Sequence, residues 1–230
     1  MRTPCLRWIS FLVAVAGSVV ATAQTPPTTA QRAGYSGLFA AAARGDTAEI
    51  TRLAAAGADV KARDGSARTP LHVAAHASQL AAMRALVAAG ADPNALEGDR
   101  YDIVTIAAVA DDSATLALSL ELGCSAKSVT SRYDGTALIA AAHLGHVEVV
   151  RALIHAGAPL DHVNNLGWTA LIESIVLGNG GARHTATLKA IVDAGANVNL
   201  ADRGGTTPLQ LAKRRNYAEM AAILEKAGAR

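Results

Sequence analysis

Aromatic residues are scarce in this chain of 230 residues, where Phe, Trp and Tyr together make up 3%. Cysteine occurs only as Cys5 and Cys124, and proline and glycine are present in ordinary amounts. The scarcity of aromatics argues against an aromatic-rich β-sandwich, and the composition as a whole argues against a long disordered tail. Alanine is abundant instead, which favours small helices that pack closely together.

The apolar run near the start, residues 9–20, is shorter than the roughly 20 residues of a membrane-spanning helix. Arg2 and Arg7 precede this run, and a small-x-small site ending at Ala23 follows it. A basic start, a short apolar stretch and such a site are the features of a secretory signal peptide. We therefore expect residues 1–23 to be a signal peptide cleaved after Ala23, and the mature protein to be periplasmic or secreted. An uncleaved anchor is the alternative, and the short run argues against it.

Cleavage would leave a chain with no excess of either charge. The sequence has 21 Lys and Arg against 19 Asp and Glu, and loss of Arg2 and Arg7 leaves 19 against 19. This balance gives no electrostatic footprint for nucleic acid. Cys124 would be the sole cysteine, so the fold must be held by packing and not by an intrachain disulfide. Residues 24–33 are polar and aperiodic, and we expect a flexible leader there.

A unit of about 33 residues recurs six times between residues 34 and 230. It is clearest in TPLHVAAHASQLAAMRALVAAGADPNA, which starts at Thr69. The units begin near residues 36, 69, 102, 136, 169 and 207, so the steps between them are 33, 33, 34, 33 and 38. A glycine recurs near the end of each unit, at Gly57, Gly90, Gly123, Gly157, Gly195 and Gly228. Six units in one register identify a repeat protein.

Each unit follows the same physical logic. Thr69 and its counterparts are placed to cap a first helix by accepting a bond from a backbone N–H. Pro70 falls in the first turn, where its missing N–H costs nothing. The second helix carries apolar residues at helical spacing, as in Val149, Val150 and Leu153. The glycine then ends that helix in a left-handed conformation, and the sequence predicts a hairpin-like turn that leads to the next unit.

The segments TPLH (69–72) and GHVEVV (145–150), together with the period of 33, resemble the ankyrin repeat. The resemblance covers residues 34–230, and the chain also resembles exported ankyrin-repeat proteins of bacteria. It implies an all-α repeat solenoid of about six ankyrin repeats, with helix pairs, protruding β-turn fingers and a concave face. Such repeats contact only their neighbours, and several must stack to be stable. Asp102 replaces the capping threonine of the third unit, which we expect to be the least regular.

The fifth unit has five extra residues, and they fall between its two helices. Thr169 and Gly195 are 26 residues apart, whereas Thr136 and Gly157 are 21 apart. The glycine-rich stretch 177–185, LGNGGARHT, is therefore predicted to be a lengthened turn. It lacks the preceding strand and the Gly-Lys-Ser/Thr of a phosphate-binding loop. A structural turn is the simplest interpretation, with a partner contact by Arg183 and His184 as the alternative.

Candidate catalytic and metal-binding groups are few. His72 is expected to bond to neighbouring backbone. His143 and His146 superficially resemble helix-borne metal ligands, but HLGHVEVV is ordinary repeat sequence and the other histidines share no ligand spacing. Glu173 replaces an apolar residue of the sister units and is expected to be partly exposed on the inner face. With no Gly-x-Ser-x-Gly motif either, we expect no enzyme, no metal site and no cofactor.

The predicted fingers hold half of the six aromatic residues that remain after cleavage. Arg68, Tyr101 and Trp168 occupy the same repeat position, directly before the cap, and ankyrin fingers project such positions toward a partner. Tyr, Trp and Arg are the residues that most often anchor interfaces, although each ring could instead pack over its neighbouring finger. Asp99 and Asp134 would add a polar rim. The candidate partner-binding residues are Arg68, Arg100, Tyr101, Arg132, Tyr133, Trp168, Arg183 and His184.

The sequence therefore predicts a monomeric, non-enzymatic protein–protein interaction module of the cell envelope. It would bind a partner protein, but neither nucleic acid nor, after signal cleavage, a membrane. The alternative is an envelope stress protein that handles a metal or a small molecule through its histidines and the inserted turn.

Overall fold

The computed structural model describes residues 26–230, so the predicted signal peptide and its cleavage site lie outside the described residues. Within this range the chain forms thirteen helices and two short strands. In chain order they are α1 (Thr29–Gly34), α2 (Gly37–Arg44), α3 (Thr47–Ala55), α4 (Pro70–His76), α5 (Leu80–Ala88), α6 (Ile103–Val109), α7 (Ser113–Glu121), β1 (Val129–Thr130), β2 (Gly135–Thr136), α8 (Ala137–Leu144), α9 (Val147–His155), α10 (Ala170–Val176), α11 (Ala182–Asp193), α12 (Pro208–Arg214) and α13 (Ala218–Lys226).

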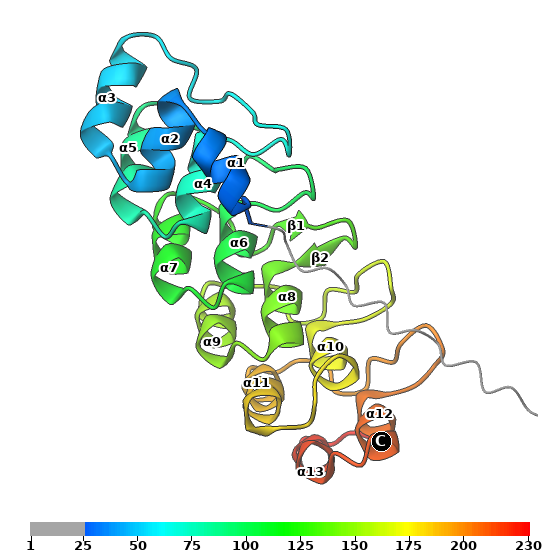
Figure 1. Cartoon of the computed structure of the whole chain (residues 1–230). Coiled ribbons are helices and arrows are strands. Elements are labelled where there is room, and N and C mark those ends of the chain that lie inside the picture. The colour runs from blue at the N-terminus through cyan, green and yellow to red at the C-terminus, as the bar shows by residue number, and fades with distance from the viewer. Residues whose placement is uncertain (1–25) are drawn as a thin grey trace, which may run out of the picture.

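Helices α2 to α13 form six antiparallel pairs in the described range, and the pairs stack into a curved solenoid (Figure 1). The first helices of the pairs pack on one another in an inner row, and the second helices pack in an outer row. Long loops leave the inner side of the stack and point the same way (Figure 1). The predicted all-α repeat solenoid is confirmed. Across residues 26–230, none of the helices has the length and apolar character needed to traverse a bilayer.

Five of the six predicted helix caps are present, whereas Ser36 makes no side-chain bond to the start of α2. Thr69, Thr136, Thr169 and Thr207 each accept a bond from the backbone N–H three residues ahead, and Asp102 does the same for α6. The third repeat is consequently as regular as its neighbours, with helices of 7 and 9 residues like those of the second. The six predicted glycines all adopt left-handed φ angles between 80° and 96°.

The core runs the whole length of the stack. In the four repeats that have a neighbour on both sides, the second residue of the inner helix, such as Leu71, Leu138 or Leu171, is at most 1% exposed because it packs between two repeats. Cys124 belongs to this core, where burial raises the pKa of its thiol to about 12 and its Sγ lies 3.2 Å from the Pro93 carbonyl oxygen. His72 bonds to backbone as expected, because Nδ1 accepts from the Thr69 N–H and Nε2 donates to the Ala95 carbonyl.

The start of the described chain differs from the flexible leader that the sequence suggested for residues 24–33. Helix α1 occupies Thr29–Gly34, and it begins with a capping box. Thr28 accepts from the Gln31 N–H, while the Gln31 side chain accepts from the Thr28 N–H. These two hydrogen bonds satisfy two backbone N–H groups at the start of the helix that would otherwise have no partner. The capping box does not depend on a periodic pattern of apolar residues, so a search for such a pattern does not reveal the helix.

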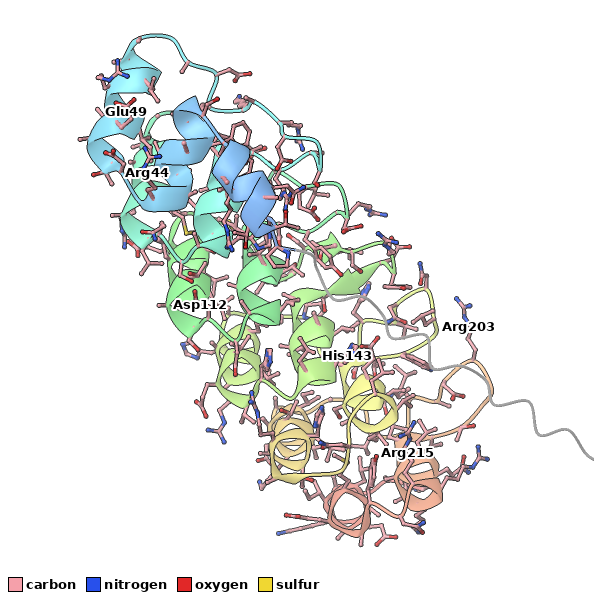
Figure 2. The ribbon with its side chains drawn as sticks, in the orientation of Figure 1. Arg44, Glu49, Asp112, His143, Arg203 and Arg215 are labelled. Carbon is pink, nitrogen blue, oxygen red and sulfur yellow. The ribbon has the colours of Figure 1, made fainter. Side chains whose placement is uncertain are left out.

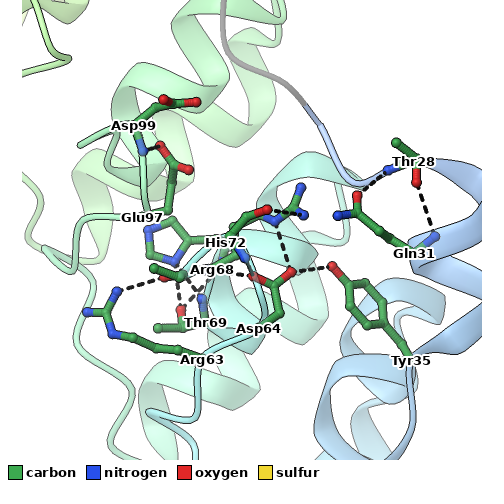
Figure 3. A network of polar contacts seen from close by, with 12 residues as sticks. Thr28, Gln31, Tyr35, Arg63, Asp64, Arg68, Thr69, His72, Glu97 and Asp99 are labelled. Carbon is green, nitrogen blue, oxygen red and sulfur yellow. Dashed lines mark hydrogen bonds and ion pairs between the residues drawn. The ribbon is translucent and has the colours of Figure 1, made fainter.

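A buried polar network fixes the first repeat to the second (Figure 3). Tyr35 donates its hydroxyl to Asp64 Oδ2 at 2.7 Å, and Arg68 Nε donates to the same oxygen at 3.0 Å. Arg68 is only 2% exposed, and the Asp64 carboxylate is an acidic partner of its buried guanidinium.

Replacing Asp64 by Ala should lower the free energy of unfolding by about 3 kcal/mol, because it removes an acidic partner of the buried Arg68 guanidinium and the bonds from the Ser66 and Arg68 backbone N–H groups. Tyr35→Phe removes one hydrogen bond to the same carboxylate and should cost about 1 kcal/mol. Urea denaturation of both variants measures the difference. Equal losses would show that Asp64 does not compensate the Arg68 charge.

Candidate functional site

Five fingers join successive repeats within the described residues: finger 1 (56–69), finger 2 (89–102), finger 3 (122–136), finger 4 (156–169) and finger 5 (194–207). Each contains a clasp, which we define as the residue five positions before the next helix cap. Its side-chain oxygen accepts bonds from the backbone N–H groups two and four residues ahead. The clasp residues are Asp64, Glu97, Ser131, Asn164 and Asp202.

The clasp decides which finger residues reach solvent. It holds the residue just before the cap at the base of the finger, where Arg68 is 2% and Tyr101 is 8% exposed. The expectation that this position projects toward a partner is therefore wrong for both residues, and Trp168 is half-buried. A partner contact by any of the three stays a prediction.

Two exposed candidates, Arg100 and Arg132, lie on fingers 2 and 3, and each pairs with an acidic residue of the other finger. Arg132 forms an ion pair with Asp99, and Arg100 Nη1 lies 3.1 Å from Asp134 Oδ1. Backbone bonds also join the fingers, since the Ser131 N–H donates to the Arg100 carbonyl at 3.0 Å. The tips of fingers 2 and 3 therefore carry paired charges. Figure 2 shows Arg203 standing out at the tip of finger 5.

A pocket opens on the concave face at the centre of the stack. Its walls come from α6, α8 and α10 and from fingers 2, 3 and 4. Tyr133 and Leu166 lie on the finger side, and Ile139 and Leu144 lie on α8. The pocket is mostly apolar, as binding sites commonly are, with a few convergent polar groups at its floor.

Glu173 and His143 form that floor (His143 is labelled in Figure 2). Glu173 is 5% exposed, so the expectation of a partly exposed carboxylate is wrong. Its Oε1 accepts a 2.7 Å bond from Asn164 Nδ2, and its Oε2 lies 3.6 Å from His143 Nδ1. Burial raises the pKa of Glu173 to about 7. Burial also lowers the pKa of His143, and the neighbouring imidazoles of His184 and His146 add to that lowering.

Glu173 and its hydrogen-bond partner Asn164 both depart from the residue types found at the equivalent positions of the other repeats. The residues equivalent to Glu173 are all apolar: Ala40, Val73, Ile106, Ala140 and Leu211. Asn164 is the sole amide among the five clasp residues, and its Nδ2 is the group that holds Glu173. An aspartate at 164 would instead place a second carboxylate there. Comparing positions across the repeats would have revealed this pairing in the sequence.

The inserted residues of the fifth repeat are shared between a turn and a helix. The turn takes only residues 177–181, and α11 has 12 residues where the other second helices have 9. Arg183 and His184 therefore lie in the first turn of α11 and not in a lengthened loop, as the sequence had suggested. The helix absorbed three of the five residues because ARHT continues its pattern of buried positions at Thr185 and Leu188.

Arg183 and His184 tie the inter-helix turns together. Arg183 Nη2 lies 2.7 Å from Asp111 Oδ2, and its Nε donates to the Gly145 carbonyl. His184 Nε2 donates to the His143 carbonyl at 3.0 Å. These contacts lie at the opposite ends of the inner helices from the fingers and link three repeats. A partner contact by this pair remains a prediction.

The histidines do not converge. His146 Nδ1 donates to the Ala108 carbonyl, and His162 Nε2 donates to the Asp134 carbonyl. Among residues 26–230, no group of three or more His, Cys, Asp or Glu side chains lies close enough to hold a metal ion.

Glu173→Gln should stabilise the protein in a pH-dependent way. The folded pKa is raised above its usual value of 4.5, so the native carboxyl keeps its proton between pH 4.5 and about 7 while the unfolded one loses it. Stability therefore falls through this window, and the full penalty of up to about 3 kcal/mol is present above pH 7. Urea denaturation should show the gain from Glu173→Gln at pH 8 and little gain at pH 4.

The matched control is Glu219→Gln, which removes the same charge from an exposed position on α13. It should change stability little at either pH. If Glu173→Gln changed stability equally at both pH values, the carboxyl would not carry the pH dependence.

The backbone conformation at Gly180 and its closeness to Tyr217 explain why the turn 177–181 has a glycine at this position. Its φ is +71°, and an added Cβ would lie 2.4 Å from the Tyr217 ring, whose hydroxyl donates to the Gly178 carbonyl. Gly180→Ala should therefore cost more than Gly195→Ala, whose φ is +93° but whose Cβ would meet open space. We expect about 1 kcal/mol for Gly195→Ala and at least twice that for Gly180→Ala. Equal melting temperatures for the two variants would show that the turn can move away from Tyr217.

Comparisons with known proteins agree with this architecture. A family model described as ankyrin repeats (three copies) matches residues 11–97 and 104–182. An ankyrin repeat domain from Acinetobacter baumannii is 44% identical, with a TM-score of 0.78 over 84% of this chain and 98% of that one. The ankyrin repeat domain of Bcl-3, a member of the IkappaB protein family, is 26% identical, with a TM-score of 0.77 over 86% and 88%.

A curated relative matches a shorter stretch. The ankyrin repeat protein YahD of Escherichia coli (strain K12) is 38% identical over 100 residues, which are 43% of this chain and 50% of YahD. The match therefore spans about half the length of that relative.

Proposed function

Because the chain belongs to the ankyrin repeat family, whose domains are generally protein–protein interaction modules, we propose that it is a non-enzymatic binding module of the cell envelope. A partner protein would lie against the concave face and the fingers.

The observation that carries this proposal is the position of the exposed apolar side chains. The large hydrophobic residues that reach solvent in residues 26–230 are Val129 (43% exposed), Val163 (46%) and Leu166 (39%). All three lie on fingers 3 and 4, which border the concave pocket. The confinement of exposed apolar side chains to two neighbouring fingers, with Leu166 lining the pocket, favours an interaction site there.

Rigidity supports the same proposal. Each finger is held by its own clasp, and fingers 3 and 4 are joined because the Asn165 N–H donates to the Tyr133 carbonyl at 2.8 Å. A surface that is ordered before binding loses little conformational entropy when the partner arrives.

An envelope location is supported by the basic start, the short apolar run and the small-x-small site of residues 1–23. A balanced mature charge and a single core cysteine are compatible with an oxidising compartment, because no disulfide is needed there. Metal handling by His143, His146 and the inserted turn has less support, since ring nitrogens of His146 and His184 are engaged by carbonyl groups.

The double variant Tyr133→Ala/Leu166→Ser tests the proposed surface, because it truncates a half-buried ring and an exposed leucine beside the pocket. In a crosslinked pull-down from envelope extract, we expect it to retain the partner about tenfold less than the wild type. The matched control is Arg84→Ala/Arg151→Ala on the outer helices, which should retain the partner fully. Equal capture by both variants, each folded by circular dichroism, would place the binding face elsewhere.

A further inference from the structure

The concave pocket carries a carboxylate but no cation. Neither lysine nor arginine is among its lining residues, and its titratable groups are Tyr101, Tyr133, His143 and Glu173. The exposed arginines of fingers 2 and 3 already have acidic partners, because Arg132 pairs with Asp99 and Arg100 pairs with Asp134. The pocket is therefore complementary to a positively charged group that comes from outside the chain.

One oxygen of Glu173 is held in place while the other is available. A carboxylate can accept about four hydrogen bonds, but Asn164 Nδ2 is the only donor to this one among residues 26–230. His143 Nδ1 is 3.6 Å from Oε2, which is longer than a hydrogen bond. A carboxylate that is 95% buried and has one unoccupied oxygen is expensive to keep unless something binds there.

The repeat pattern shows that the fold itself does not require this carboxylate. All five sister positions are apolar, and Val73 and Ile106 are fully buried, so Glu173 is the exception among the repeats. Asn164 keeps the clasp bonds that every finger needs, to Leu166 N and Trp168 N, and adds the bond that orients Glu173. Glu173 and Asn164 thus depart from the repeat pattern together, and the buried carboxylate lowers the stability of the protein. Departures of this kind are typical of a functional site.

The walls of the pocket suit the stem of a long cationic side chain. Tyr101 and Tyr133 offer aromatic rings, which attract cations over their faces. Ile139, Leu144 and Leu166 offer aliphatic surface. Lysine and arginine bury their methylene stems against such surface while the charged head seeks an acceptor.

We propose that this pocket binds a lysine or arginine side chain of the partner protein, with the cationic head at Glu173 Oε2 and the stem between Tyr133 and Leu166. The inference rests on the proposed function and adds the chemistry that the partner must present.

Selection from a random peptide library displayed on phage tests the inference without knowing the partner. The baits are the full chain without residues 1–23, its Glu173→Gln variant, and Glu219→Gln as a control that loses the same charge away from the concave face. We expect the wild type and the control to select peptides with Lys or Arg at a recurring position. The Glu173→Gln variant should show no such preference.

Two synthetic peptides then measure the contact between the cationic side chain and Glu173. A selected peptide and its analogue with norleucine in place of the cationic residue are titrated into each protein. The wild type should bind the cationic peptide about tenfold more tightly than the analogue, because a charge-assisted hydrogen bond is lost. Glu173→Gln should bind the two about equally, which makes the pair a double-mutant cycle for this one contact.

The outcomes separate the two proposals. Peptides that bind the concave face without a cation, or a cation preference that survives Glu173→Gln, would overturn the inference and leave the proposed function standing. Failure of every bait to select any peptide would contradict both. Because Glu173→Gln is expected to be more stable than the wild type, a loss of cation preference cannot be assigned to unfolding.

Discussion

The clasp is the interaction on which the binding surface depends. A single side-chain oxygen, from Asp64 to Asp202 along the stack, takes two backbone N–H groups in each finger and so sets its shape. This forces a positive φ at the residue two before the cap, such as Arg100 at 66° or Asp134 at 51°. The residue after it turns inward. The clasp thus determines which side chains of a finger are buried and which are exposed. Because the five fingers share this contact, their exposed residues lie on the same face of the stack.

The helix pairs could be predicted from the sequence, whereas the directions of the finger side chains could not. Period, caps and terminal glycines are local signals, because a threonine at a helix start or a glycine at φ near 90° acts within a few residues. The resemblance to ankyrin repeats predicts that Arg68 and Tyr101 project toward a partner, because it places them at a finger position that varies and points outward. Their burial follows from the clasp, whose members are as different as Glu97 and Ser131 and share no obvious motif.

The insertion shows a related limit. Counting residues locates the five extra positions between two helices, but it does not divide them between turn and helix. That division depends on packing, because Thr185 and Leu188 are buried while Gly180 must pass close to the Tyr217 ring. Arg183 then reaches Asp111, 72 positions earlier in the chain, a contact that only the stacking of three repeats creates.

Glu173 is the place where fold and function make opposite demands. Stacking favours an apolar residue there, and the sister repeats have one; a buried carboxylate instead weakens the protein as pH rises toward 7. Asn164 does not remove that cost, since a neutral amide compensates no charge. It only fixes the carboxylate, leaving Oε2 toward the pocket. A group that is oriented but not neutralised is arranged for a charge that the chain itself does not supply, and this makes an external cation the simplest account of the pair.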